Sequence, residues 1–515
     1  MKHIKKLASL LLVLVMVFAL ATTAFAEETT YSITINNSTA GHTYEAYQIF
    51  TGDLATNEAG NKVLSNIVWG PGVSEAGQTA LGDAAAKAET LKTEADAKAF
   101  AKAVAPYLAT AAGSANTVTD GKYVISGLAA GYYLVKDQDG SLTGDNDSYT
   151  EYIIQVVGNV TATPKSDVPE VEKKVKDTND STGVTSDWQD SADYDIGDSV
   201  PFQLKATLAD NVSSYTTYKV VFHDTLSKGL TYNNDAKVYI DGTETNGFTV
   251  TATVNADGIT TLTVSCDDVK ALGAGNSSVI TVEYTAKLNE NAVLGSAGNP
   301  NEVYLEYSNN PNKSENGNNE TGETPKDVVI VFTYKTIINK VDSENAPLTG
   351  AAFKLEKLIK GKDGAAGTWT TAKEFTVDET TTSFTFSGLD DGQYKLTETK
   401  TPAGYNTIDP IYLVIEATHD ATADTPALTV LKAYLTDENG NKKTEVKDGE
   451  TVNIDLGTVD LTAGSITTTV VNKSGSELPS TGGIGTTIFY VLGGVLVLAA
   501  VVLLVTKKRM SGAEK

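Results

Sequence analysis

The sequence predicts a mainly all-β protein of tandem Ig-like β-sandwich domains, and three observations carry this prediction. Short runs of Thr, Val, Tyr and Ile alternate with polar residues along most of the chain, with the period of half-buried strands. Pairs such as Asp241-Gly242 and Asp257-Gly258, which are typical of tight hairpin turns, separate these runs. The 515 residues are enough for about two to four ordinary domains, each with the several short strands of a sandwich.

The chain begins with the features of an export signal. Lys2, Lys5 and Lys6 precede an apolar stretch from residue 7 to 21, and Ala24-Phe25-Ala26 supplies small residues before a cleavage point. This order is typical of a secretory signal peptide. We therefore expect residues 1–26 to be removed and Glu27 to begin the mature protein.

The first domain is expected over residues 27–166. A stretch from residue 75 to 112 is rich in Ala, Glu and Lys and has no proline before Pro106, so we expect a helical insertion in this domain. The run Thr163-Pro-Lys-Ser-Asp-Val-Pro169 is bracketed by prolines and predicts a linker. The sequence therefore predicts a domain boundary at residue 166.

A second domain is expected over residues 167–329 and a third over residues 330–476. The polar stretch from residue 309 to 326 is expected to form a loop late in the second domain. The motif Ser387-Gly-Leu-Asp-Asp-Gly-Gln-Tyr394 repeats Ser126-Gly-Leu-Ala-Ala-Gly-Tyr-Tyr133 with the same spacing. This repeat predicts that the first and third domains share a fold.

Residues 477–515 have the features of a membrane anchor. Leu478-Pro479-Ser480-Thr481-Gly482 precedes an apolar run from residue 484 to 506, and Lys507-Lys-Arg509 follows it. A helix that crosses a bilayer needs roughly 20 apolar residues. A basic cluster after such a helix stays on the cytoplasmic side. The sequence therefore predicts a C-terminal transmembrane helix in the precursor.

Composition excludes several classes of function. The formal net charge is −25, and the single arginine, Arg509, lies in the basic tail, so we expect no binding to nucleic acid. Cys266 is the only cysteine, which rules out a disulfide within the chain. His42, His223 and His419 are scattered, without a zinc-type cluster or a nucleophile–base motif. We therefore expect no enzyme, no cofactor and no bound metal.

Strand alternation places polar residues on faces that are otherwise apolar. Lys173 shares a face with Val171 and Val175, whereas Lys174 points to the opposite face. The same pattern recurs in both of the later domains. The residues in question are Lys173, Asp224 and Asn301 in the second domain, and Lys340, Glu398 and Asn472 in the third.

Burial would give these residues a specific chemistry. A buried ammonium or carboxylate tends to become neutral. A neutral lysine amine is a nucleophile, and a protonated acid can polarise the amide carbonyl of asparagine. Held together at effective molarities on the order of 10⁵ M, lysine and asparagine could form an amide bond and release ammonia. Alternation alone leaves a second interpretation, in which these residues lie at the surface of half-exposed strands.

The third domain resembles a CnaB-type, SpaA-like domain. The resemblance rests on Ile338-Asn-Lys340-Val-Asp342, Leu348-Thr-Gly-Ala-Ala-Phe353, Gly392-Gln-Tyr-Lys-Leu-Thr-Glu398-Thr, Pro402-Ala-Gly-Tyr405 and Val470-Val-Asn472-Lys. It implies an isopeptide bond between Lys340 and Asn472, with Glu398 as the acid that catalyses its formation.

The second domain resembles the middle domain of pilus shaft proteins. The resemblance rests on Glu172-Lys-Lys-Val-Lys-Asp177, Asp224-Thr-Leu-Ser-Lys-Gly-Leu-Thr-Tyr232 and Asn299-Pro-Asn-Glu-Val-Tyr304. It implies a bond between Lys173 and Asn301 with Asp224 as the acid. Lys174 is the alternative lysine, which strand alternation disfavours.

The first domain lacks one partner for such a bond. Alignment of the repeated motif places Asp137 at the position of Glu398, but the opening strand, Tyr31 to Asn37, contains no lysine. We therefore expect no isopeptide bond in this domain. Asp137-Gln-Asp-Gly140 is faintly similar to a calcium loop, but its flanking residues do not follow EF-hand spacing, so a solvated turn is expected.

Leu478, Pro479, Ser480, Thr481 and Gly482 resemble the LPxTG sorting signal of Gram-positive surface proteins. The resemblance implies that a sortase cleaves between Thr481 and Gly482 and transfers the Thr481 carbonyl to an amine. Shaft pilins carry the acceptor lysine in a motif that ends Tyr-Pro-Lys, and Thr163-Pro164-Lys165 is similar to it. Thr163 replaces the tyrosine and the upstream tryptophan of the motif is absent, so a plain linker lysine is the alternative.

These resemblances imply the major shaft subunit of a covalently polymerised, sortase-assembled pilus that acts in adhesion. The chain would be secreted and anchored covalently to the peptidoglycan of a Gram-positive cell wall. Its expected partners are a sortase, further copies of the chain joined head to tail, minor tip and base pilins, peptidoglycan and host surface ligands. The alternatives are a monomeric wall-anchored adhesin whose first domain binds a host ligand, a minor pilin, and a wall-anchored enzyme.

Overall fold

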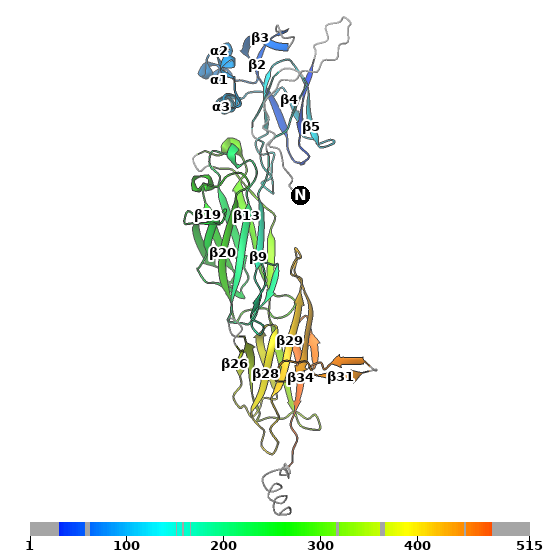
Figure 1. Cartoon of the computed structure of the whole chain (residues 1–515). Coiled ribbons are helices and arrows are strands. Elements are labelled where there is room, and N and C mark those ends of the chain that lie inside the picture. The colour runs from blue at the N-terminus through cyan, green and yellow to red at the C-terminus, as the bar shows by residue number, and fades with distance from the viewer. Residues whose placement is uncertain are drawn as a thin grey trace, which may run out of the picture.

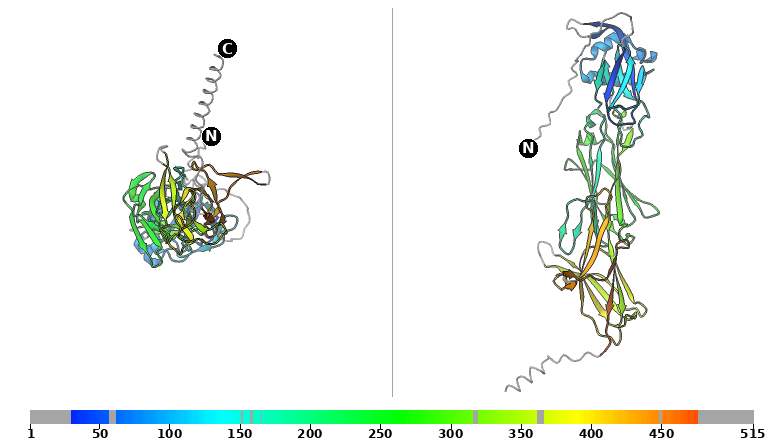
Figure 2. Two further views of the ribbon diagram at one scale, coloured as in Figure 1. Left: turned by 90° about the horizontal axis from the view of Figure 1, so that it is seen from below. Right: turned by 90° about the vertical axis from the view of Figure 1, so that its right-hand side faces the viewer.

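The computed structural model describes residues 30–56, 62–150, 152–156, 159–164, 166–315, 319–360, 366–447 and 450–475. These residues form three β-rich domains that follow one another in a row (Figures 1 and 2). The predicted mainly β fold in tandem domains is confirmed. In the described part of the chain, no helix is long and apolar enough to span a membrane. The predicted signal peptide, Lys165 and residues 477–515 lie outside the described residues.

The first domain is a sandwich of two small sheets. One sheet has the order β5-β1-β8, with β1 parallel to β8, and the other has the order β3-β2-β6-β7, with β4 also paired to β2. Apolar side chains of alternate residues, such as Ile33 and Ile35 of β1, meet Tyr123 and Val135 between the sheets. The strands are β1 (Tyr31–Asn36), β2 (Tyr44–Thr56), β3 (Lys62–Trp69), β4 (Gly113–Ala115), β5 (Lys122–Leu128), β6 (Tyr132–Asp137), β7 (Ile153–Val156) and β8 (Val160–Ala162).

The predicted helical insertion forms three short α-helices and a 3₁₀ turn. Two N-terminal caps divide it. The side chain of Asp83 accepts a hydrogen bond from the Ala86 backbone, and Thr93 forms a capping box with Asp96. Each of these caps starts a new helix. Phe100 of the third helix packs against Phe50 of β2. The elements are α1 (Glu75–Leu81), α2 (Ala84–Thr90), α3 (Glu94–Val104) and η1 (Ala105–Tyr107).

The middle domain is a larger sandwich. One sheet has the order β17-β16-β20-β13-β9 with β15 added to β20, and the other has the order β12-β23-β21-β14-β19-β18 with β22 added to β21. The strands are β9 (Glu170–Val175), β12 (Ser191–Asp193), β13 (Ser199–Thr207), β14 (Val220–Leu226), β15 (Leu230–Tyr232), β16 (Lys237–Ile240), β17 (Thr243–Thr245), β18 (Thr249–Val254), β19 (Thr260–Cys266), β20 (Val279–Leu288), β21 (Asn299–Ser308), β22 (Thr321–Glu323) and β23 (Asp327–Phe332). Because β23 pairs with β21, the middle sheet extends to Phe332, beyond the boundary expected at residue 329.

Short elements connect the longer strands of the middle domain. They are β10 (Thr178–Asn179) and β11 (Val184–Thr185), which pair with each other, and the 3₁₀ turns η2 (Val212–Ser214), η3 (Val269–Leu272) and η4 (Pro311–Lys313). The turn η4 lies in the polar stretch that was expected to form a loop. That stretch contacts the first domain, because the Tyr149 backbone N–H donates to the Asn309 carbonyl and the Asn312 amide donates to the Thr150 carbonyl.

The C-terminal domain repeats the topology of the first. Its strand β24 is antiparallel to β27 and parallel to β34, as β1 is antiparallel to β5 and parallel to β8. The facing sheet has the order β26-β25-β28-β29-β30, and the hairpin β31–β32 projects from the side of the domain (Figure 1). The strands are β24 (Tyr334–Val341), β25 (Ala352–Ile359), β26 (Thr368–Glu374), β27 (Ser383–Leu389), β28 (Gly392–Lys400), β29 (Ile411–His419), β30 (Leu428–Thr436), β31 (Thr444–Lys447), β32 (Glu450–Asn453), β33 (Thr458–Asp460) and β34 (Ser465–Val471).

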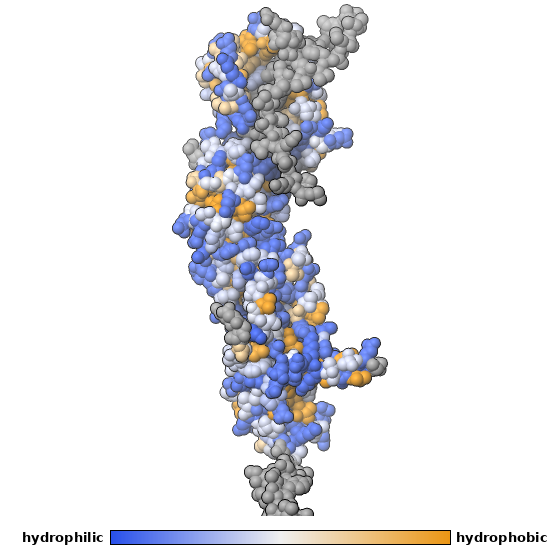
Figure 3. All heavy atoms as spheres, viewed as in Figure 1, coloured by the Kyte–Doolittle hydropathy of each residue, from blue (hydrophilic) through white to orange (hydrophobic). Residues whose placement is uncertain are grey.

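The face of the molecule shown in Figure 3 is mainly hydrophilic, with small and scattered apolar areas. Each domain has an apolar core between its sheets, and the middle domain has the largest. A hydrophilic exterior with a negative net charge favours solubility. The lysine, acid and asparagine residues predicted on apolar strand faces need a separate explanation.

Candidate functional site

The structure brings Lys173, Asp224 and Asn301 together in the core of the middle domain. Lys173 lies on β9 in one sheet, whereas Asp224 on β14 and Asn301 on β21 lie on adjacent strands of the facing sheet. The side chains of all three are fully buried. The alternative interpretation, in which these residues lie at the surface, is therefore wrong for this set.

A tyrosine connects the three side chains. The Lys173 Nζ lies 2.5 Å from the Asp224 Oδ1, and the Tyr284 hydroxyl donates to the Asp224 Oδ2 over 2.5 Å. The Asn301 Nδ2 donates to the Tyr284 oxygen over 2.7 Å. The Asn301 Oδ1 is buried and, among the described residues, has no hydrogen-bond partner. It is therefore the atom available to accept a hydrogen bond from a protonated acid.

The surroundings of this set favour neutral forms of the acid and the amine. Burial lowers the pKa of Lys173, although the negative charge of Asp224 opposes this shift. Burial also raises the pKa of Asp224, with Lys173 opposing it. The rings of Phe202 and Tyr284 lie 5.4 and 5.5 Å from the Lys173 Nζ and exclude water from it. The site can therefore present an unprotonated amine beside a protonated acid.

Lys174, the alternative lysine, lies on the opposite face of β9. Its ammonium pairs with the carboxylate of Asp190, and its side chain is half-buried. Burial alone would lower the pKa of Lys174, but the bond to Asp190 raises it overall. The geometry therefore brings Lys173, and not Lys174, to the Tyr284 hydroxyl that Asn301 also contacts.

The C-terminal domain holds the second set on neighbouring strands. Lys340 lies near the end of β24, opposite Val470 of the parallel strand β34, and Asn472 follows that strand directly. Glu398 reaches them from β28 in the facing sheet. All three side chains are buried, so the surface interpretation is wrong here too.

The contacts of this second set differ from those of the first, because here the asparagine contacts the acid directly and the lysine contacts backbone carbonyls. The Asn472 Nδ2 donates to the Glu398 Oε2 over 3.0 Å and to the Asn406 carbonyl over 2.9 Å. The Lys340 Nζ donates to the Val341 and Val470 carbonyls over 3.1 and 3.0 Å. Burial lowers the pKa of Lys340 against the opposing charge of Glu398. Within the described segments, the Asn472 Oδ1 and the Glu398 Oε1 lack hydrogen-bond partners.

The first domain places different residues at the equivalent positions. From the strand register, Asn37 stands where the C-terminal domain has Lys340. Asp137 accepts hydrogen bonds from the His42 Nδ1 over 2.8 Å and from the Thr150 backbone over 2.7 Å. Asp139 pairs with Lys136. Both acids of the motif that is faintly similar to a calcium loop therefore have partners within the protein. Among the described residues, the partners of the Asp137 side chain are His42 and Thr150 and not a lysine.

Sequence analysis missed Tyr284, which joins the acid to the asparagine in the middle domain. It lies on β20, where Ile280, Val282, Tyr284, Ala286 and Leu288 form an inward-facing stripe. A tyrosine in such a stripe needs a buried partner for its hydroxyl, and this was the signal available in the sequence. The identity of the partner depends on packing between the sheets.

Replacing Tyr284 with phenylalanine is expected to slow amide formation in the middle domain by at least tenfold. The change removes the hydrogen bonds that orient Asp224 and Asn301 but keeps the ring that excludes water. Intact mass followed with time after expression measures the rate, and the C-terminal bond of the same molecule is the internal control. Equal rates in the wild type and the variant would show that the hydroxyl has no part in the reaction.

Three segments of the chain match families of known proteins. Residues 196–311 match the Gram-positive pilin backbone subunit 2, Cna-B-like domain, and residues 335–427 match the SpaA prealbumin-like fold domain. Residues 470–511 match the LPXTG cell wall anchor motif. The chain is similar to Gram-positive backbone pilins in these three segments. The three matches occur in the order that the sequence predicted for this pilin.

Known pilins resemble this pilin over most of its length. The trypsin-resistant surface T6 protein of Streptococcus pyogenes serotype M6 is 27% identical over 461 residues, which cover 76% of this chain and 77% of the relative. The solved T6 backbone pilin of the same serotype superposes with a TM-score of 0.57 at 18% identity, over 88% of this chain and 100% of that chain. The full-length major pilin SpaD of Corynebacterium diphtheriae gives a TM-score of 0.49 at 19% identity, over 88% and 99% of the two chains.

This pilin is a structural subunit of a sortase-assembled pilus and not an enzyme. Its anchor motif indicates covalent attachment at the cell wall, on the surface of a Gram-positive bacterium. The predictions of family, function and localisation are confirmed. Residues 478–482, which carry the sorting sequence, lie outside the described residues.

Proposed function

We propose that this pilin forms the pilus shaft through an amide bond between Thr481 of one copy and Lys165 of the next. A covalent contact between two different surfaces of identical subunits generates an open filament. Lys165 follows the first domain and Thr481 follows the C-terminal domain, so the middle and C-terminal domains lie between the two ends of each link. Minor tip and base pilins and host surface ligands would be further partners of this filament.

We also propose that each of these two domains contains an isopeptide bond, Lys173–Asn301 and Lys340–Asn472. In each reaction the lysine Nζ attacks the side-chain carbonyl carbon of the asparagine, and the acid, Asp224 or Glu398, holds a proton on the carbonyl oxygen. The C–N bond to the asparagine amide nitrogen then breaks and ammonia leaves with the transferred proton. The observation that carries this proposal is the burial of a complete lysine, acid and asparagine set in both domains.

These bonds would determine which parts of the pilin bear tension. Force entering at Lys165 would cross from Lys173 to Asn301, continue along the chain to Lys340, and cross to Asn472 before it leaves through Thr481. The residues between 173 and 301 and between 340 and 472 would then lie off the stretched path. Most of both sandwiches is thereby protected from unfolding under load.

The intact mass of the secreted segment, residues 27–476, tests both bonds together. The expected mass is lower than the sequence mass by two ammonia molecules, because each bond releases one. Asn301→Ala and Asn472→Ala should each restore the mass of one ammonia, apart from the substitution itself. A wild-type mass equal to the sequence mass would contradict both assignments.

A further inference from the structure

The junction between the middle and C-terminal domains gathers many acids around two basic side chains. The basic residues are Lys357 and His419, both from the C-terminal domain. The acids are buried or half-buried, and they are Asp177, Asp180, Asp193, Asp195, Asp198, Asp390 and Asp391. Carboxylates removed from water are stabilised by nearby positive charge, from a basic side chain or from a bound cation.

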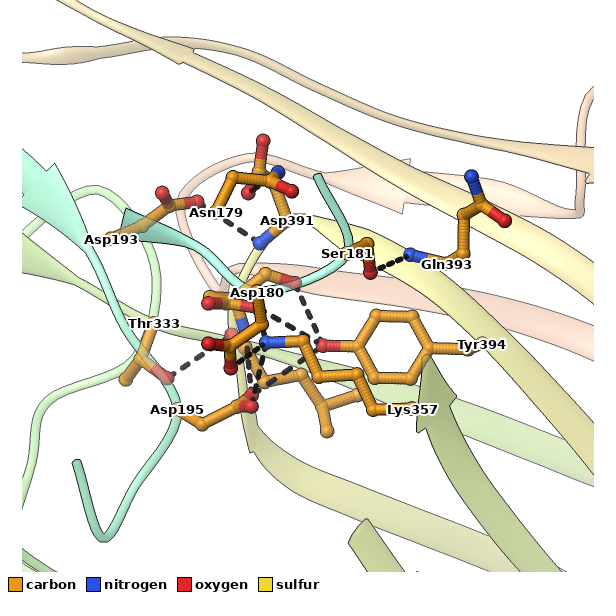
Figure 4. A network of polar contacts seen from close by, with 12 residues as sticks. Asn179, Asp180, Ser181, Asp193, Asp195, Thr333, Lys357, Asp391, Gln393 and Tyr394 are labelled. Carbon is orange, nitrogen blue, oxygen red and sulfur yellow. Dashed lines mark hydrogen bonds and ion pairs between the residues drawn. The ribbon is translucent and has the colours of Figure 1, made fainter. Parts of the chain in front are cut away.

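Lys357 fills one half of the junction (Figure 4). Its ammonium lies 2.7 Å from Asp195 and 3.0 Å from Asp180 of the middle domain, and it also contacts Asp390 of its own domain. Burial alone would lower the pKa of Lys357, but the charges of Asp390, Asp195 and Asp180 raise it overall. This half of the junction therefore already holds a cation that belongs to the chain.

The other half brings Asp177 and Asp193 of the middle domain to His419 of the C-terminal domain. The His419 Nε2 lies 3.4 Å from the Asp177 Oδ2 and 3.8 Å from the Asp193 Oδ1, and the three donor atoms all lie within 4.8 Å of one another. These separations exceed the usual N–H···O distance of about 2.7–3.2 Å. The shorter one matches the spacing of roughly 3.3–3.5 Å between two ligands of one tetrahedral metal ion.

Ser191 fixes the orientation of the His419 ring, so that its Nε2 faces the two aspartates. The Ser191 hydroxyl donates to the Asp420 carbonyl over 2.7 Å, so its oxygen accepts from the His419 Nδ1, which also lies 2.7 Å away. Burial alone would lower the pKa of His419, but Asp177 and Asp193 raise it to about 9, so a metal ion at the Nε2 would replace a proton there. A hydrogen bond that fixes Nδ1–H in this way is typical of histidines that bind metals through Nε2.

A second polar group, the Tyr334 hydroxyl, lies beside Asp193. The side chain of Tyr334 is fully buried, and its hydroxyl has no hydrogen-bond partner within the part of the chain that the structure describes. Burial raises the pKa of Tyr334, and Asp193 and then Asp391 add to this shift, which places the hydroxyl next to the same carboxylates. A buried hydroxyl normally has a partner, so this one indicates a ligand atom or a water bound at the cluster.

We propose that Asp177, Asp193 and His419 bind one divalent transition-metal ion, Zn²⁺ in the first instance, and that this ion joins the middle domain to the C-terminal domain. One imidazole nitrogen and two carboxylate oxygens are ligands that Zn²⁺ accepts, whereas Ca²⁺ prefers six to eight oxygens. The two carboxylates balance the charge of the ion. Sequence analysis predicted no metal here, because the ligands come from two domains and do not follow a short motif.

Titration calorimetry of EDTA-treated secreted pilin, residues 27–476, with Zn²⁺ tests this proposal. The expected result is one equivalent of saturable binding, and a rise of roughly 5–10 °C in Tm when free Zn²⁺ exceeds Kd a hundredfold. His419→Gln and Asp193→Asn should each weaken binding at least tenfold and remove the rise in Tm. His223→Gln is the matched control, because His223 also faces a carboxylate, Glu306, but lies far from the junction on β14.

Two results would overturn the proposal. One is the absence of saturable Zn²⁺ binding to the wild type, which would mean that a proton on His419 compensates the two aspartates. The other is unchanged binding in His419→Gln together with its loss in Asp390→Asn, which would place the ion in the Lys357 half of the junction. The half-exposed Asp177→Asn variant provides a third measurement if the more buried changes prevent folding, and intact mass verifies the fold through the two isopeptide bonds.

Discussion

Asn301→Ala is expected to lower the Tm of the middle domain by roughly 10–20 °C, and Asn472→Ala to do the same for the C-terminal domain. Each proposed bond would close a loop of more than about 100 residues, and a cross-link of this span stabilises a fold by about 4.7 kcal/mol through the entropy of the unfolded chain. In a domain of this size, 1 kcal/mol corresponds to roughly 2–4 °C in Tm. Differential scanning calorimetry of each variant against the wild type measures the loss.

Lys173 and Lys174 provide a matched pair of controls for this result. Lys173→Met removes the same bond from its other end, so it should lower the Tm about as much as Asn301→Ala. Lys174→Met changes the neighbouring residue on the opposite face and should retain the bond, with only the loss of stability that comes from leaving the Asp190 carboxylate unpaired. If Asn301→Ala eliminates the bond, as judged by mass, yet leaves the Tm unchanged, the bond does not stabilise the domain.

Lys165→Ala is expected to abolish polymerisation almost completely. The proposed link requires a free lysine amine at this position, and alanine has no nucleophile that could take the Thr481 carbonyl from a sortase. An immunoblot of cell-wall digests boiled in SDS should show a ladder of multimers for the wild type and a single monomer band for the variant. Lys176→Ala is the control, because it removes another lysine near the start of the middle domain and should retain the ladder.

Two other outcomes of that immunoblot would change the account in different ways. A ladder in the Lys165→Ala strain would retain the shaft but assign the link to another lysine. A single monomer band in the wild type would instead favour the monomeric wall-anchored adhesin and contradict the proposed polymer. Because boiling in SDS separates noncovalent assemblies, any remaining ladder reports covalent links alone.

The buried polar sets were predictable from the sequence because strands have a strict two-residue period. Once Val171 and Val175 were assigned to the core, Lys173 had to share it, and the same rule applied to Asn301 and Lys340. The sequence also shows that the first strand of the first domain contains no lysine. The structure places Asn37 at the position that Lys340 has in the C-terminal domain. Local periodicity therefore identified the residues of both candidate sites, whereas the resemblance to known domains was needed to prefer burial over the surface interpretation.

Features that depend on contacts between distant segments could not be predicted in this way. The partner of Tyr284 comes from the facing sheet, and the ligands around His419 come from the preceding domain. The helical insertion was predicted as one stretch, but local capping by Asp83 and Thr93 divides it. Periodicity identifies the face of a strand on which a residue lies, but not the side chain that it meets across a core or a domain junction.

The most direct test of the covalent shaft is tandem mass spectrometry of protease-digested polymer purified from the cell wall. The account predicts a branched peptide in which the carbonyl of Thr481 is joined to the Nζ of Lys165, together with the two internal cross-links, Lys173 to Asn301 and Lys340 to Asn472. A polymer in which Thr481 is joined to a different lysine, or in which Asn301 and Asn472 remain unmodified, would contradict it.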